Sequence, residues 1–182
     1  MSVEDSLKIA AFSVTAIAFA TGIYQYWKAQ RWRRAEFVAE EIRSMKADPH
    51  VRAAMLMLDW DGREIDLHPE QSTHDKRWIV VTQDLLIGAL RRHDRDPPFT
   101  ADEARIRDIL DAFLDYFERF NQFAEAGLVP ALAFEPYLRY WCALIADRRR
   151  SAVPALSDYI DFYGYHGVQR LLHSLGYAIS ER

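Results

Sequence analysis

The feature that most constrains this chain is an uncharged run from Ile9 to Trp27, in which no Asp, Glu, Lys or Arg occurs. A helix needs roughly 20 mostly apolar residues, at about 1.5 Å rise per residue, to cross a lipid bilayer. The run is close to that length, and aromatic and basic residues, which are typical of a membrane–water interface, lie at and beyond its end. The sequence therefore predicts a transmembrane helix over 9–27, anchored by Trp27, Lys28, Arg31, Trp32, Arg33 and Arg34.

Two alternatives compete with this interpretation. A cleaved signal peptide carries positive charge before its apolar run and a small-residue cleavage site after it. Here Glu4 and Asp5 precede the run, and bulky aromatic and arginine residues follow it, so the sequence disfavours cleavage. A buried core helix is the second alternative, because Ala, Ser and Thr make the run only moderately hydrophobic and Gln25 lies within it.

The positions of the charges predict an orientation. Lys and Arg near the end of a span are retained on the cytoplasmic side. The chain is then a single-pass protein of the inner cell membrane, with a short extracytoplasmic N-terminus over 1–8, a juxtamembrane basic helix over 28–48 and a cytoplasmic helical domain over 49–182. A single cysteine, Cys142, excludes an internal disulfide framework and fits a reducing compartment.

Small residues on one side of the run predict self-association of the span. Helices within lipid gain little from the hydrophobic effect and associate by close packing at small side chains. Ala11, Thr15, Ala18 and Gly22 follow a spacing that places them on nearly the same helix face. We therefore expect a homo-oligomer through this face.

Composition limits the remaining function classes. The net charge is −4, so no global basic field indicates a nucleic-acid partner. Hydrophobic residues make up 50% of the chain and aromatic residues 13%, which is ample for one buried core. Nucleotide-binding, hydrolase and metal motifs are not found in the sequence, so it predicts no cofactor, no metal site and no catalytic residue.

Local signals predict a mainly α fold in which the transmembrane helix continues into a cytoplasmic helical bundle. Asp48 caps a new helix at Pro49, and Thr100 with Glu103 forms a capping box for the longest soluble helix. The alternating residues 64–67 and the β-rich residues 78–81 predict a small two-stranded ribbon.

The most distinctive soluble segment is Asp59-Trp60-Asp61-Gly62. It does not fit a calcium loop, because Met57 and His68 would occupy positions that require acidic ligands. A turn is favoured, with Gly62 at positive φ, the aspartates bonding backbone amides and Trp60 buried in the core. An enzyme that uses the carboxylates of Asp59 and Asp61 remains an alternative.

Three further features have simple structural interpretations. The acidic row on the helix after Thr100 predicts a solvated face that would suit a basic partner; its members are Asp108, Asp111, Asp115, Glu118, Gln122 and Glu125. The segment 163–167, Tyr-Gly-Tyr-His-Gly, predicts a turn between helices, with a small ligand pocket as the alternative. Cys142, beside Trp141 on an apolar helix, is expected in the core rather than as a nucleophile.

The order of several short segments resembles a family of small uncharacterised bacterial membrane proteins with one N-terminal span and a helical cytoplasmic domain. The segments are Gln25 to Trp32, Arg34 to Val38, Met57 to Trp60, Ile106 to Asp108, Phe113 to Phe120, Pro136 to Trp141 and Tyr159 to Gly167. The resemblance covers nearly the whole chain. It implies an architecture only, since the family has no assigned activity and contributes no functional residues.

The favoured function is a membrane-anchored, non-catalytic interaction or scaffold protein. Its expected partners are the lipid bilayer, a second copy of the chain through the span, and a protein that binds the cytoplasmic domain. Two alternatives from other classes stay open: an oligomeric membrane effector or pore subunit, and the carboxylate-dependent enzyme.

Overall fold

The structure is a computed structural model that describes residues 3–68, 78–94 and 97–178. Of the residues at the start of the first helix, the side chains of 3–11, 13 and 14 are not described. The chain divides into two compact units, Met1–Ala39 and Glu40–Arg182, so the boundary lies inside a helix. Each unit is described by itself.

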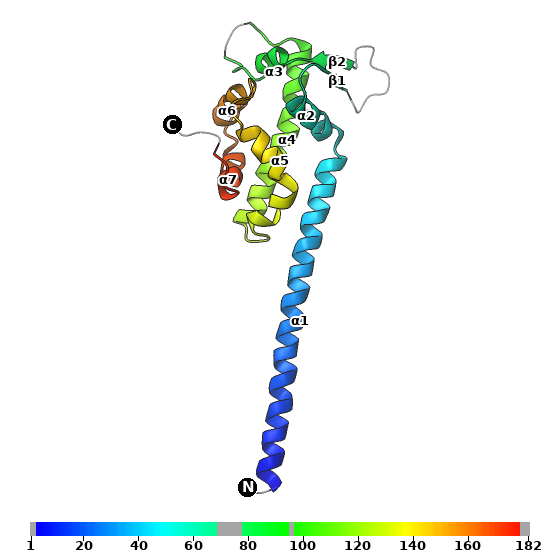
Figure 1. Cartoon of the computed structure of the whole chain (residues 1–182), viewed down its shortest axis with the longest axis vertical. Coiled ribbons are helices and arrows are strands. Elements are labelled where there is room, and N and C mark those ends of the chain that lie inside the picture. The colour runs from blue at the N-terminus through cyan, green and yellow to red at the C-terminus, as the bar shows by residue number, and fades with distance from the viewer. Residues whose placement is uncertain (1–2, 69–77, 95–96, 179–182) are drawn as a thin grey trace. The chain divides into compact units, whose positions relative to one another are not determined.

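Helix α1, Val3–Ala47, is one continuous helix (Figure 1). The predicted juxtamembrane helix over 28–48 corresponds to the last part of α1, which ends at Ala47. Within the part of the chain that the structure describes, no helix combines the length and the hydropathy that a membrane crossing requires.

The second unit is mainly helical. After the last turns of α1 it contains α2 (Pro49–Asp59), α3 (Gln83–Ala89), α4 (Ala101–Glu125), a short 3-10 helix η1 (Ala131–Ala133), α5 (Glu135–Ala146), α6 (Val153–Phe162) and α7 (His166–Ser174). Strands β1 (Arg63–Asp66) and β2 (Trp78–Val81) form an antiparallel pair in which Ile65 is opposite Ile79. The predicted mainly α fold with a two-stranded ribbon is confirmed; the polar link between the strands, 69–77, lies outside the described residues.

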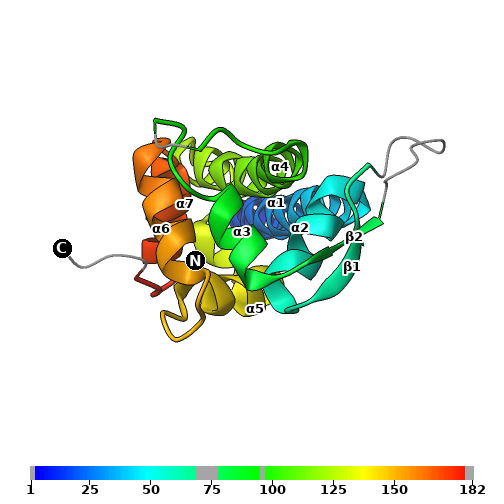
Figure 2. The same cartoon turned by 90° about the horizontal axis from the view of Figure 1, so that it is seen from above.

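Helix α4 is the centre of this unit, with α2, α3 and α7 packed against it (Figures 1 and 2). Its capping box at Thr100 and Glu103 is present as predicted. The buried face of α4 consists of Ile106, Ile109, Leu110, Phe113, Leu114, Phe117, Phe120 and Asn121. Phe120 also stacks on Phe134, with ring centroids 4.6 Å apart.

The second unit includes the end of α1. Ile42 and Met45 are buried, and Glu41 forms a 2.9 Å ion pair with Arg119 of α4. Asp48 then accepts hydrogen bonds from the backbone N–H groups of His50 and Val51, so the predicted cap of α2 is confirmed. This connection fixes the last turns of α1 to the domain that follows.

Candidate functional site

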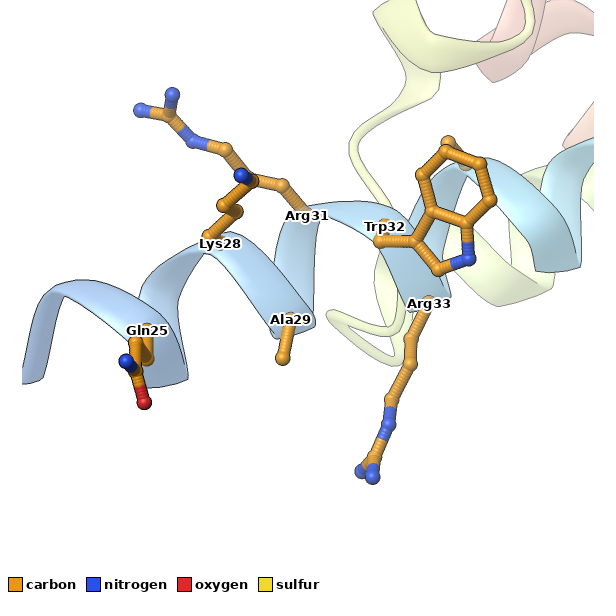
Figure 3. Close-up of a pocket in the computed structure, with 7 residues that line it drawn as sticks. Gln25, Lys28, Ala29, Arg31, Trp32 and Arg33 are labelled. Atoms are coloured by element: carbon orange, nitrogen blue, oxygen red, sulfur yellow. The ribbon is translucent and has the colours of Figure 1, made fainter. Parts of the chain in front are cut away.

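The predicted anchoring residues lie on the surface of α1. Trp27 and Trp32 are both exposed, and Trp32 leaves 73% of its surface uncovered. Figure 3 shows Lys28 and Arg31 extending from one side of the helix and Arg33 from the other. The hollow in this view is lined by residues of this one helix, between Gln25 and Ala35. The arrangement is a collar of cations and aromatics around a helix, and it provides no enclosed binding site.

The predicted association face precedes this collar. Thr15, Ala18 and Gly22 are exposed, and the side chain of Ala11 lies outside the described residues. A Cβ added at Gly22 would meet nothing within 4 Å among the atoms described. The space beside Gly22 is therefore free for another helix or for lipid.

The turn after α2 is confirmed in part. Gly62 has φ 67°, and Asp61 Oδ1 accepts a 3.0 Å hydrogen bond from the backbone N–H of Gln83, which lies at the start of α3. Asp59 instead accepts a hydrogen bond from the Tyr140 hydroxyl of α5, and this bond raises the pKa of Tyr140. The prediction that Trp60 is buried is wrong: 54% of its surface is exposed, and its ring contacts the Arg63 guanidinium.

The structure brings together two features that the sequence presents separately, the acidic row of α4 and the segment 163–167. Asp111 Oδ1 accepts hydrogen bonds from Tyr159 Oη at 2.6 Å and from Tyr165 Oη at 2.7 Å. Burial, together with the Asp111 carboxylate, raises the pKa of both tyrosines far above the usual range. The two hydroxyls therefore stay protonated and act as donors, which suits a structural contact between α4, α6 and the start of α7.

The same row contributes a second contact to α7. Glu118 Oε1 accepts a 3.0 Å hydrogen bond from the backbone N–H of Val168, near the helix N-terminus. A carboxylate in this position satisfies an amide that has no partner within its own helix. Gly167 allows the approach, since a Cβ there would lie 2.8 Å from the Glu118 carboxyl carbon. The predicted solvated face is thus wrong for Asp111 and Glu118, although Asp108, Asp115, Gln122 and Glu125 are exposed.

Two arginines, Arg91 and Arg107, contact the loop that precedes α4. Arg91 pairs with Glu103 and also donates to the carbonyl groups of Pro97 and Pro98 at 3.0 Å. The hydrogen bond from Arg91 lowers the pKa of Glu103. Arg91 and Arg107 both contact the ring of Phe99, at 4.2 Å and 4.4 Å from its centroid. These contacts hold the loop before α4 in place. Both arginines therefore have structural partners in the folded chain.

Cys142 is fully buried, as the sequence predicts. Burial, with a smaller contribution from Glu135, raises the pKa of its thiol to about 12. Since the thiolate is the reactive form of cysteine, this residue is inert at neutral pH in the folded chain.

A groove of about 660 Å³ lies between α4, η1 and α7. Asn121, one of its lining residues, is only 4% exposed, and its Nδ2 atom is buried with no hydrogen-bond partner among the described residues. The other polar residues of its lining are Glu125, Gln169, Arg170, His173 and Ser174. The sequence interpretation missed Asn121, and the signal that could have revealed it is an amide one turn after Phe117, on the apolar side of α4.

Within the described ranges, no group of three or more His, Cys, Asp or Glu side chains is arranged to hold a metal ion. The segment 163–167 forms the helix-to-helix turn that the sequence predicts, with Gly164 at φ 77°. Comparison with known proteins gave no match, whether to a protein-family model, to a curated protein or to a solved structure. The resemblance to small bacterial membrane proteins therefore stays a prediction.

Proposed function

We propose that the chain is a non-catalytic interaction protein, attached to a lipid bilayer by the apolar part of α1, whose second unit binds a partner. The observation that carries the proposal is the series of large apolar side chains that α1 exposes: Phe12, Ile17, Phe19, Ile23, Tyr24, Tyr26, Trp27 and Trp32. Leaving such a side chain in water costs about 1.5–3 kcal/mol relative to burying it. A medium or partner that covers this part of α1 therefore stabilises it.

A lipid bilayer suits this part of α1 for two reasons. A helix that lies on a membrane surface has a strongly charged face opposite its apolar face, whereas 9–27 carries no charge on any side. The cations after it extend from opposite sides of the helix (Figure 3), which suits a helix end surrounded by lipid headgroups. These features support the proposed span over 9–27, with the second unit on the side of the cations.

The hydrogen bonds of three aspartates support a non-catalytic role. Asp111 accepts hydrogen bonds from two tyrosines, Asp59 from one tyrosine, and Asp61 from a helix N-terminus. Each of these groups thus has a structural role in holding helices together. These contacts favour a structural rather than a catalytic role for the three carboxylates.

Flotation of the purified full chain with phosphatidylcholine–phosphatidylglycerol vesicles tests the membrane attachment. The natural chain should float with the vesicles and resist extraction at alkaline pH. The control variant Ala35→Asp, which introduces the same charge outside the span, should behave in the same way. Ile17→Asp should reduce the bound fraction strongly, because Asp at the centre of a span costs roughly 2.5–3.5 kcal/mol. Recovery of the natural chain in the vesicle-free fraction, with its helical content intact, would refute the attachment.

A further inference from the structure

The loop between α4 and α5 exposes apolar side chains that the packing of the second unit does not use. This apolar loop, residues 126–134, includes η1 and carries no charged side chain. Leu128 and Leu132 leave 54% and 66% of their surface uncovered, and Tyr137 in the first turn of α5 leaves 43%. Single exposed apolar residues are common on proteins, whereas a group of them marks an interaction site.

The apolar loop is anchored by its other side chains. Val129 is 2% exposed, and Phe134 is fully buried and stacks on Phe120 of α4. Gly127, at φ 69°, ends α4, and the backbone N–H of Leu128 donates a 3.1 Å hydrogen bond to a carbonyl of the last helical turn. The exposed leucines therefore belong to a loop with a defined conformation.

The charged side chains on either side of the apolar loop already have partners. Glu125 pairs with Arg170 at 2.7 Å, and Glu135 pairs with Arg139 at 2.6 Å. Each pair is neutral as a whole. The loop is therefore bordered by neutral pairs, which favours an apolar medium over a charged partner.

Contacts between α1 and α4 place the apolar loop at one end of the second unit. Glu41 pairs with Arg119 at 2.9 Å, and Ser44 Oγ lies 3.4 Å from Tyr116 Oη. The later residue of α1 meets the earlier residue of α4, so the last turns of α1 run antiparallel to α4. After Arg119, α4 continues for about 9 Å to its end at Glu125. The loop thus lies at the end where the chain enters this unit, away from α3 and the ribbon (Figure 1).

The chain that enters at this end comes from the proposed span. The uncharged run 9–27 and the cations within 28–34 precede Glu40, and about 20 Å of helix separate Trp27 from that residue. Leucine is typical of side chains that enter the headgroup boundary of a bilayer, and tyrosine is enriched at membrane–water interfaces. The composition of the apolar loop therefore suits the surface of the same bilayer.

We infer that the apolar loop is a second membrane contact, in which Leu128 and Leu132 insert into the headgroup boundary of the bilayer and the Tyr137 ring lies at its surface. The inference rests on the proposed membrane attachment and adds the face that the second unit turns towards the lipid. Covering one half-exposed leucine favours the docked position roughly tenfold. Two leucines are therefore enough to hold a unit that α1 already keeps close to the membrane.

Fluorescence quenching in phosphatidylcholine–phosphatidylglycerol vesicles tests this contact. In the full chain with Cys142→Ser, Leu132→Cys carries a nitrobenzoxadiazole label, and the vesicles contain a spin-labelled lipid with its quencher either near the headgroups or at the bilayer centre. We expect blue-shifted emission and stronger quenching from the headgroup side, because interfacial insertion reaches about 5–10 Å. The same label on Val80→Cys, a position 51% exposed on β2 of the ribbon, should stay unquenched.

Two charge variants test the burial of the leucines. Leu128→Asp should lower the ratio of quenched to unquenched label at position 132 at least about tenfold, because it removes one buried leucine and adds a charge. Val80→Asp introduces the same charge at a similarly exposed apolar residue and should leave the ratio unchanged. Since the loop is uncharged, added salt should not reduce the quenching either.

A label at position 132 that is quenched no more than the label at position 80 would overturn the inference. A label on Ala18→Cys, within the proposed span, separates this failure from that of the proposed function. Quenching at position 18 alone would retain the span and refute the loop contact. Absence of quenching at both positions would refute both.

Discussion

Tyr159 Oη donates a 2.6 Å hydrogen bond to Asp111 Oδ1 and so joins α6 to α4 across a buried contact. Tyr159 is 1% exposed, and Tyr165 shares the same acceptor. Asp111→Ala would leave both hydroxyls without this acceptor. We expect the free energy of unfolding, measured in urea, to fall by about 2–4 kcal/mol.

Asp115→Ala is the matched control for this change, because Asp115 lies one turn further along α4 and is exposed. Partial burial and repulsion from Asp111 and Glu118 raise the pKa of the Asp115 carboxyl, so removal of its charge should be neutral or slightly stabilising. Equal losses in the two variants would refute the structural role of Asp111.

A side chain at Gly167 is expected to cost the hydrogen bond between Glu118 and Val168. A Cβ there would displace the Glu118 carboxylate from the N-terminus of α7, so Gly167→Ala should destabilise the chain by about 1–3 kcal/mol. Gly22→Ala is the control, since its Cβ would meet no atom and Ala is the better helix former. Thermal unfolding should therefore separate the two variants, and an unchanged melting temperature for Gly167→Ala would contradict the close approach.

Stability on the acid side should depend on Glu103. Its pKa in the folded chain is held below the ordinary value of 4.5 by the hydrogen bond from Arg91. The stabilisation is therefore complete above pH 4.5 and is lost as the pH falls through the lower folded value. Glu103→Gln should flatten the fall in the free energy of unfolding below pH 4.5. If the free energy of unfolding of this variant falls below pH 4.5 as steeply as that of the natural chain, the Arg91–Glu103 pair is not the cause of the acid sensitivity.

The contribution of Cys142 to stability should fall as the pH rises, the opposite of the dependence expected for Glu103. Its folded pKa of about 12 lies above the ordinary value of 9.0, so its contribution to stability is present below pH 9 and is lost as the pH rises towards 12. At pH 8 the thiol should react with an aromatic disulfide reagent only after unfolding in urea. Rapid labelling of the folded chain would contradict its burial.

The self-association of α1 remains a prediction. Ala18→Ile with Gly22→Ile should weaken crosslinking of the chain in membranes, because bulky side chains prevent close helix packing. Phe12→Leu with Phe19→Leu, which changes large residues on other sides of the helix, should leave it unaltered. Crosslinking that survives the Ile substitutions would place any oligomer contact elsewhere and would weaken the pore alternative.

Much of the fold follows from local signals. The caps at Asp48 and Thr100 act on amides within three residues, and the ribbon follows from alternation within each strand, so the sequence suffices to predict them. Trp60 was predicted wrongly because its position depends on the direction in which the turn leaves α2. A local pattern does not contain that direction.

The candidate contacts were harder to predict for the same reason. Asp111 has the spacing of a solvated residue, and its partners Tyr159 and Tyr165 lie far along the chain. Asn121 differs from its exposed neighbour Gln122 only in the side of α4 that it occupies. Which polar residue of a helix meets another helix depends on packing between distant segments.

Cysteine labelling in cells tests the central claim, that α1 crosses a bilayer over 9–27, most directly. In a Cys142→Ser background, single cysteines replace Ser2, Ala18 and Ala35, and intact or lysed cells are treated with a membrane-impermeant maleimide. The proposed span predicts labelling of position 2 in intact cells, of position 35 only after lysis, and of position 18 only in denaturing detergent. Labelling of position 18 as fast as position 35 in lysed cells, with the membranes left intact, would contradict the span.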